Sequence, residues 1–219
     1  MIRPDMATLL AFVCTDAGLP RKALERVVAV AAEQSFNCVT VDGDTSTNDS
    51  FVVAATGQGP QASSGRDLLE LQIAITAVAQ QLAQAIVRDA EGATKFVTIQ
   101  IDRGRSAEEC RRVAYAIAHS PLVKTAFFAS DPNLGRILAA IGNSGVPIEA
   151  DKIDLYLDDV LVAAGGSRHP AYREEQGVAA MRKPEFKVRA VLNRGKAAAT
   201  LWTCDLSFDY VKINAEYRT

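Results

Sequence analysis

Apolar residues recur at every third or fourth position in several stretches of the chain, which is the spacing of an amphipathic helix. The longest stretch opens at Arg66 and keeps this spacing from Leu68 to Ile86, and Gly92 can end it. Ser106 with Glu109 three residues later resembles a capping box at the start of another helix. The predicted helices are 20–34, 66–89, 106–119 and 133–141.

Shorter apolar runs predict strands, and the first of them, Leu9–Val13, is continuous enough to indicate a buried strand. The other predicted strands are 36–41, 50–55, 95–101, 122–128, 152–157, 160–163, 186–192, 197–206 and 211–215. Two pairs predict hairpins, 152–157 with 160–163 and 186–192 with 197–206, the second turning at Asn193-Arg194-Gly195. Helices and strands mix without a regular βαβ repeat, which indicates an α+β or mixed α/β fold in layers.

Composition narrows the class of protein. The chain has 219 residues, a net charge of -2, 48% hydrophobic and 23% charged residues, as expected of a soluble globular protein. Without a basic patch, an apolar run of membrane-spanning length or a signal peptide, we expect a cytoplasmic protein with no nucleic-acid or membrane partner. The four cysteines are widely spaced, so we expect reduced, mostly buried thiols and no zinc site.

The segment 42–49 is rich in oxygen ligands and invites a calcium interpretation. It lacks the glycine and the glutamate that a calcium loop needs at its sixth and twelfth positions. We therefore predict no metal, and a loop whose carboxylates and hydroxyls bond its own backbone N–H groups.

Thr8 is the candidate nucleophile. It follows Ala7 and opens the first apolar run. Its hydroxyl can be activated by its own α-amino group, which exists only if the Ala7–Thr8 peptide bond is cut. Such an amino group titrates near ~7.7–8.0 and can accept a proton at cytosolic pH. The alternative is a β-branched residue at the start of a strand.

The residues Pro4-Asp-Met-Ala-Thr-Leu-Leu-Ala-Phe12 resemble the cleavage motif of the ornithine acetyltransferase (ArgJ) family of arginine biosynthesis. Five further blocks resemble the family in the same order: 41–49, 91–95, 120–125, 131–137 and 204–219. The resemblance implies the family's own two-chain fold and a precursor that cuts itself between Ala7 and Thr8. Residues 1–7 would then end an α chain, and 8–219 would form the β chain, with lobes suggested at 8–145 and 146–219.

The resemblance also implies an activity, the transfer of acetyl from N2-acetylornithine to glutamate through an acetyl-threonine at Thr8. Some members also make N-acetylglutamate from acetyl-coenzyme A. No metal or redox cofactor is implied. The family's substrate-binding positions fall on Thr8, Glu91, Asn214 and Thr219. The α chain is implied as a partner that supplies oxyanion donors, in an α2β2 assembly.

The residues themselves are compatible with these roles. Glu91 follows a predicted helix, where a carboxylate is unfavourable and a cationic partner would be useful; the alternative is a solvated charge. Asn214 lies on the last predicted strand, on the face opposite that of its apolar neighbour Ile213. Two rival functions remain: a self-processing amidase or aminopeptidase with water as acceptor, and a truncated, non-catalytic subunit whose Ala7–Thr8 bond stays intact.

Overall fold

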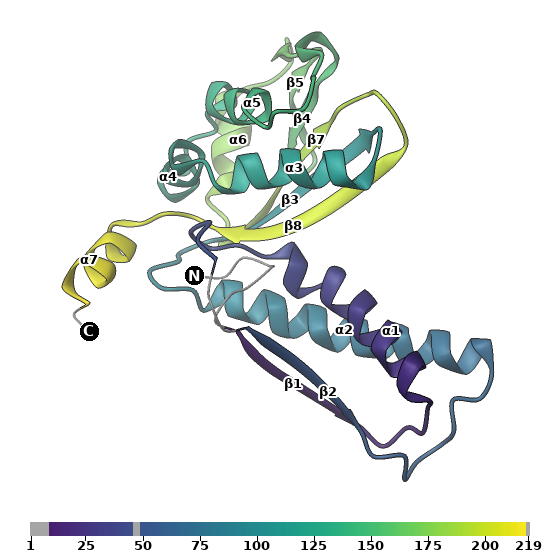
Figure 1. Ribbon diagram of the computed structural model, residues 1–219. Helices are drawn as coiled ribbons and strands as arrows, with labels where there is room; N and C mark the ends of the chain where they lie inside the picture. Colours follow the sequence, from purple (N-terminus) through teal and green to yellow (C-terminus); the bar gives the residue numbers. More distant parts are fainter. Residues whose placement is uncertain (1–8, 46–48, 218–219) are drawn as a thin grey trace. The chain divides into compact units, whose positions relative to one another are not determined.

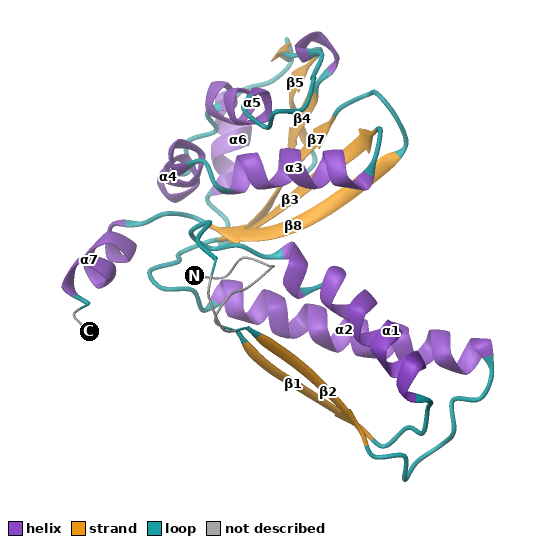
Figure 2. Ribbon diagram, viewed as in Figure 1, coloured by secondary structure: helices purple, strands orange, loops and turns teal. Residues whose placement is uncertain are grey.

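The computed structural model describes residues 9–45 and 49–217, drawn by chain position in Figure 1 and by secondary structure in Figure 2. Packing divides the chain into two compact units, Met1–Ile86 and Val87–Thr219, and each is described by itself. The suggested lobes stay a prediction; the boundary between them, at 145, falls inside the second unit.

The first unit contains a two-stranded parallel sheet. β1 (Leu10–Thr15) and β2 (Ser50–Ala55) pair residue for residue. Val13 is buried, whereas Leu10 and Phe12 are 67% and 66% exposed. The strand is apolar on both faces but buried on only one, which corrects the expectation of a strand buried on both sides.

Two helices cover one side of this sheet (Figure 1). They are α1 (Arg21–Glu33) and α2 (Gly65–Arg88), the last two residues of which belong to the second unit. Both agree with the predicted helices to within one residue at each end. Small residues such as Ala31, Ala79 and Ala83 are fully buried, so each helix packs closely along an alanine-rich stripe.

The strand predicted over 36–41 is wrong, because the chain forms a short 3-10 helix, η1 (Phe36–Cys38), directly after α1. The Ser35 hydroxyl donates to the carbonyl of Ala31, and the Asn37 amide donates to the Glu33 carboxylate at 3.1 Å. These local hydrogen bonds stabilise a helical turn directly after α1, although the side chains alternate as they would in a strand.

The second unit is built on a six-stranded mixed sheet in the order β6-β5-β4-β7-β3-β8. Its strands are β3 (Phe96–Gly104), β4 (Asp154–Leu157), β5 (Val160–Ala164), β6 (Ser167–Arg168), β7 (Glu185–Val191) and β8 (Ala197–Cys204). β3 and β7 run parallel, and the other neighbouring pairs run antiparallel. This mixed sheet confirms the predicted mixed α/β fold, and the β4–β5 hairpin is confirmed as well.

Helices of the second unit pack on and around this sheet: α3 (Ala107–Ala118), α4 (Pro121–Ala129), α5 (Leu134–Gly142), η2 (Ala150–Lys152) and α6 (Glu174–Met181). One more helix, α7 (Phe208–Glu216), follows β8, and none of its residues is buried. Figure 2 shows α3 lying along β3 and β8. Val97, Ile99 and Ile101 of β3 are fully buried in one core with Val113 and Ile117 of α3. The packing of α3 on β3 and β8 holds β8 in place, and the chain leads from the end of β8 into α7.

The helix caps explain where two of these helices begin. The Ser106 hydroxyl accepts the Glu109 N–H at 3.1 Å, as the sequence predicted. The Glu109 carboxylate accepts the N–H of Arg105 rather than that of Ser106, so only half of the predicted capping box forms. In α5, the Asn133 side chain caps the first turn in the same way.

The strand predicted over 122–128 is wrong, because these residues form α4. Pro121 stands at the first helical position, and the Ser120 hydroxyl accepts the Val123 N–H at 3.4 Å. Proline at this position costs no hydrogen bond, so it starts the helix here instead of only ending the previous one.

Two further predictions in the second half of the chain are wrong. Strands 186–192 and 197–206 exist as β7 and β8, but they flank β3 and do not pair with each other. The last residues form α7 instead of a strand, because Ser207 caps a helix by accepting the Tyr210 N–H at 3.2 Å. No residue of α7 is buried. The alternation of Val211, Ile213 and Ala215 therefore does not mark the buried face of a strand.

All four cysteines lie within the described residues and are thiols, not disulfides. Cys110 and Cys204 are buried, whereas Cys14 is exposed, so the predicted burial holds for only part of the set. Burial raises the pKa of the Cys110 thiol. Among the described helices, none combines the length and the apolar character of a membrane span.

Candidate functional site

Two of the predicted substrate-binding residues lie in contact in the second unit. Glu91 follows α2 in a turn, and Asn214 lies on α7 instead of on the predicted strand. The Asn214 amide donates to Glu91 Oε2 at 3.2 Å and to the Tyr210 carbonyl at 2.9 Å. The two residues, 123 positions apart, are both exposed, so a ligand can reach them.

A buried carboxylate holds the turn that carries Glu91. Asp205, 3% exposed, accepts the N–H of Thr94 at 2.8 Å, its hydroxyl at 2.5 Å, and the N–H of Lys95 at 3.0 Å. Such a group is stable inside a protein only when its oxygens are hydrogen-bonded. Asp205 therefore joins two of the blocks that resemble the family, the block 91–95 and the block that begins at Cys204.

Ser207 makes a second connection between the same segments. Its hydroxyl donates to the Gly92 carbonyl at 2.5 Å while it caps α7. Gly92 has a φ of +66°, and a Cβ atom there would lie 2.4 Å from the backbone nitrogen of Tyr210. Glycine is thus required both by the backbone conformation and by the close approach of α7.

The Lys95 side chain connects the turn to the residue after α4 and to the last residue of α6. Lys95 Nζ donates to the Ser130 hydroxyl and, at 2.6 Å, to the Met181 carbonyl. Burial lowers the pKa of Lys95, and the Asp205 carboxylate partly opposes that shift. Ser130 itself has a φ of +55°, which is uncommon for a residue with a Cβ atom.

Lys124 is 4% exposed and joins α4 to the end of β8. Its ammonium group donates to the Thr203 hydroxyl at 3.1 Å and to the Cys204 carbonyl, and its own carbonyl accepts the Leu206 N–H at 3.2 Å. The chain on both sides of Asp205 is therefore fixed from α4.

The predicted nucleophile lies outside the described residues, as do Ala7 and Thr219. Leu9, the next residue after Thr8, is described: its N–H donates to the Asp49 carboxylate, and its carbonyl accepts the Ser50 N–H at 2.6 Å. The end of the segment 42–49 therefore lies beside the start of β1 in the first unit.

The described part of the segment 42–49 has the predicted self-bonded form at one point, where Asp42 accepts the N–H of Asp44 at 3.0 Å. Within residues 9–45 and 49–217, no group of three or more histidine, cysteine, aspartate or glutamate side chains is arranged to hold a metal ion.

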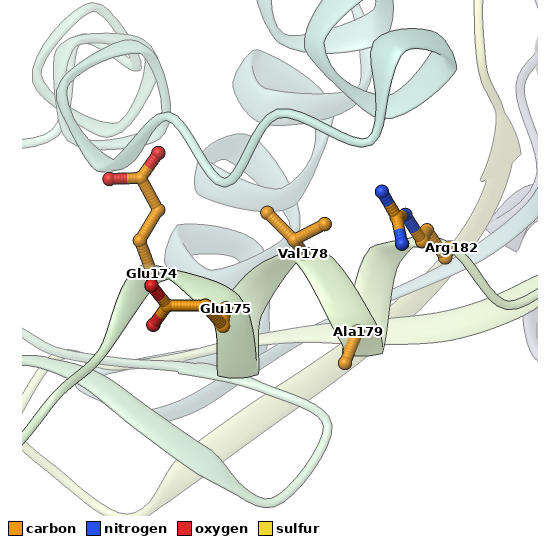
Figure 3. A pocket seen from close by; sticks show the side chains of 5 residues that line it. All are labelled: Glu174, Glu175, Val178, Ala179 and Arg182. Atoms are coloured by element: carbon orange, nitrogen blue, oxygen red, sulfur yellow. The ribbon is translucent and has the colours of Figure 1, made fainter.

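Two surface hollows lie away from these residues. One, of about 460 Å³, lies along α6, and Figure 3 shows Glu174 and Glu175 at one end of it and Arg182 at the other. The second, of about 480 Å³, lies between α1 and α2 in the first unit. Neither includes Glu91 or Asn214.

The contact between Glu91 and Asn214 brings together two kinds of acceptor, a carboxylate and an amide carbonyl, which can receive an ammonium group. Sequence reasoning found both residues through the family resemblance. It missed Asp205, Ser207 and Lys124, although each stands in a block that it had noted. No local signal could have found them, because aspartate, serine and lysine side chains are usually exposed.

Comparisons with known proteins agree with the resemblance. The ArgJ family matches the chain over residues 1–219. Two proteins named "Arginine biosynthesis bifunctional protein ArgJ", from Neisseria meningitidis serogroups A and B, are each 53% identical over 224 residues, which cover 100% of this chain and 55% of theirs. The chain thus spans about half the length of the curated relatives it matches. A crystal structure of an arginine biosynthesis bifunctional protein argJ from Bacillus halodurans is similar, with a TM-score of 0.90 and 35% identity over 96% of this chain and 100% of that one.

Proposed function

Since the chain belongs to the ArgJ family, we propose that it is the nucleophile-bearing part of an ornithine acetyltransferase, which moves an acetyl group from N2-acetylornithine to glutamate in arginine biosynthesis. The observation that carries the proposal is the family match over residues 1–219. The contact between Glu91 and Asn214 supports the amino-acid subsite that the proposal needs.

The reaction runs in two steps on Thr8. Its hydroxyl oxygen attacks the acetyl carbonyl carbon, and its free α-amino group takes the hydroxyl proton. The carbon–nitrogen bond of N2-acetylornithine breaks, the proton passes to the leaving amine, and an acetyl ester remains on Thr8. The amine of glutamate then attacks this ester, gives up a proton and leaves as N-acetylglutamate with the hydroxyl restored. Both steps pass through an oxyanion, for which one hydrogen-bond donor is worth ~10²–10³ in rate.

Glu91 and Asn214 bind the substrate in this proposal. N2-acetylornithine carries a free side-chain ammonium group, and a carboxylate next to an amide carbonyl suits it. Because both residues are exposed, the attraction grows only when the bound substrate or the α chain excludes water from the site. Thr219 belongs to the same subsite as a further proposal by family position.

The α chain is the proposed partner, and the first unit offers a surface for it. In the described residues β1 pairs with β2 alone. The sheet face away from the buried side presents Leu10, Phe12 and Val52, which are 67%, 66% and 45% exposed. A two-stranded sheet is only marginally stable on its own, and an exposed apolar face on it indicates a surface that another chain covers. The curated relatives have nearly as much chain again as the part matched here, enough to cover it.

Phe12→Ser tests this docking surface. We expect the variant to lose co-purification with the α chain, because it removes a large apolar side chain from the centre of the face. Leu122→Ser, which removes a comparably exposed apolar side chain from the second unit, is the control. Equal co-purification of the Phe12 variant and the wild type would contradict the docking proposal.

A second activity follows from the relatives that are named bifunctional. We propose that acetyl-coenzyme A also acetylates Thr8, so that the same second step makes N-acetylglutamate without N2-acetylornithine. Formation of N-acetylglutamate from glutamate and acetyl-coenzyme A, lost in Thr8→Ala, is the expected result. Formation that persists in this variant would exclude a shared nucleophile.

The proposed function is tested by product analysis of the enzyme assembled from this chain and its α chain. With N2-acetylornithine and glutamate we expect ornithine and N-acetylglutamate in equal amounts. Free acetate that forms equally well without glutamate would favour an amidase. An intact mass that retains the Ala7–Thr8 bond, together with no turnover, would favour a non-catalytic subunit.

A further inference from the structure

The carboxylate of Asp205 controls the turn that carries Glu91. It is buried at the end of β8, and its three hydrogen bonds go to Thr94 and Lys95, which follow Glu91 by three and four residues. Hydrogen bonds to an ionised acceptor are shorter and stronger than those between neutral groups. The turn 91–95 is thus held to the chain that leads into α7.

The same chain carries Asn214 to the other side of the turn. Ser207 donates to the Gly92 carbonyl and caps α7, and seven residues later Asn214 donates to Glu91. Because no residue of α7 is buried, its placement depends on these bonds, on the close approach to Gly92 and on the contact between the rings of Phe208 and Phe128, whose centroids lie 5.5 Å apart. Asp205 therefore holds the turn that carries Glu91, and it lies two residues before Ser207, which caps the helix that carries Asn214.

Lys124 holds the chain around Asp205 from the side of α4. It holds the residues before and after Asp205 through its ammonium group and its carbonyl. Asp205 thus has a fixed backbone and a side chain whose acceptors are all directed at the turn. A carboxylate whose only function was solubility would be exposed, as Asp209 is in the same segment.

We propose that Asp205 is a positioning residue of the amino-acid subsite, which sets the distance between Glu91 and Asn214 and so the affinity for the substrate ammonium group. This inference rests on the proposed function. It assigns to Asp205 no contact with substrate. It predicts that a change at Asp205 acts on catalysis through Glu91.

Asp205→Asn is the test variant, studied in the enzyme assembled from this chain and its α chain. Asparagine has the same size, but one of its side-chain atoms is a donor that would face the donors of Thr94 and Lys95, so at least one bond is lost. We expect the KM for N2-acetylornithine to rise by about 10-fold or more, since a misplacement of 1 Å can cost about 10²-fold. Asp209→Asn, with the same loss of charge at an exposed position, is the control and should keep the wild-type KM.

A double-mutant cycle with Glu91→Gln separates positioning from general damage to the fold. If Asp205 acts mainly through Glu91, the two changes together raise the KM by clearly less than the product of their single effects, because the charge that Asp205 positions is already absent. Effects that multiply would overturn the proposal, and so would an unchanged KM in Asp205→Asn.

Hydrogen exchange distinguishes this inference from the proposed function itself. Asp205→Asn should speed exchange in both 91–95 and 208–216, whereas Asp209→Asn should leave 91–95 unchanged. If the wild-type enzyme transfers no acetyl but this pattern holds, the proposed function fails and the positioning of the pair stands. Unchanged exchange in both segments of Asp205→Asn overturns the inference whatever the activity.

Discussion

Gly92→Ala tests the placement of α7 most simply. Gly92 has a φ of +66°, and an alanine Cβ would lie 2.4 Å from the Tyr210 nitrogen and 2.9 Å from the Asp209 carbonyl carbon. Gly57 has nearly the same φ, +70°, but a Cβ there meets nothing within 4 Å. Gly57→Ala is therefore a matched control that carries the backbone strain without the collision.

The two variants differ by a free energy that the contacts define. Left-handed backbone costs alanine roughly 1–2 kcal/mol at either position. At Gly92, α7 must also move away by about 1 Å to reach an ordinary contact distance, which breaks the bonds from Ser207 to Gly92 and from Asn214 to Glu91. At about 0.5–1.5 kcal/mol for each bond, the additional loss is about 1–3 kcal/mol.

Limited trypsin digestion measures this loss at Lys212, within α7. Cleavage of a folded segment follows the population of its open form, and about 1.4 kcal/mol changes that population tenfold. We expect cleavage after Lys212 about 5- to 140-fold faster in Gly92→Ala, and at the wild-type rate in Gly57→Ala. Equal cleavage rates in the two variants would refute the close packing of α7 on the turn.

Three further predictions concern single side chains of the second unit. Glu91→Gln should raise the KM for N2-acetylornithine and leave cleavage before Thr8 intact, because it removes the charge that attracts the ammonium group; an unchanged KM would leave Glu91 as a helix-end charge only. Tyr172→Phe should leave the free energy of unfolding in urea unchanged or raise it by up to about 1 kcal/mol, because the buried hydroxyl has no hydrogen-bond partner in the described residues. A clear loss of stability would show that this hydroxyl is satisfied. The ion pair from Arg88 to Glu185, 2.8 Å long, lowers the pKa of Glu185 below its ordinary 4.5, so its contribution is present above that value and is lost as the pH falls through the lowered pKa. Glu185→Gln should therefore lower the free energy of unfolding near about pH 7 by no more than about 1 kcal/mol, because both side chains are largely exposed. The loss should shrink as the pH falls through the lowered pKa, and a loss that is the same at neutral and at acid pH would contradict the linkage.

The elements that the sequence predicted well are those whose signals are local. Helices α1, α2 and α3 have long periodic stretches, and the Ser106 cap defines the start of α3. The run 122–128 was too short for its period to distinguish a strand from a helix, and the cap at Ser120 decided the outcome. In α7 the apolar residues are not buried, so their spacing along the chain could not indicate a helix with one buried face.

Pairing and the site depended on distant contacts. Both β7 and β8 were recognised as strands, but their separation by β3 follows from the packing of the whole sheet and not from the turn between them. The proximity of Glu91 and Asn214 was expected only from the family resemblance. The burial of Asp205 had no local signal at all, because an aspartate after a strand is usually solvated.

The acetylation state of Thr8 tests the central claim most directly. The assembled enzyme is incubated with N2-acetylornithine without glutamate, stopped in acid and digested, and the peptide that begins at Thr8 is weighed by mass spectrometry. If Thr8 is the nucleophile, we expect a β chain that starts at Thr8 and carries one acetyl group, which hydroxylamine removes as it does an ester and which is lost when glutamate is added. Rapid formation of N-acetylglutamate by an enzyme whose Thr8 never carries an acetyl group, or remains joined to Ala7, would contradict it.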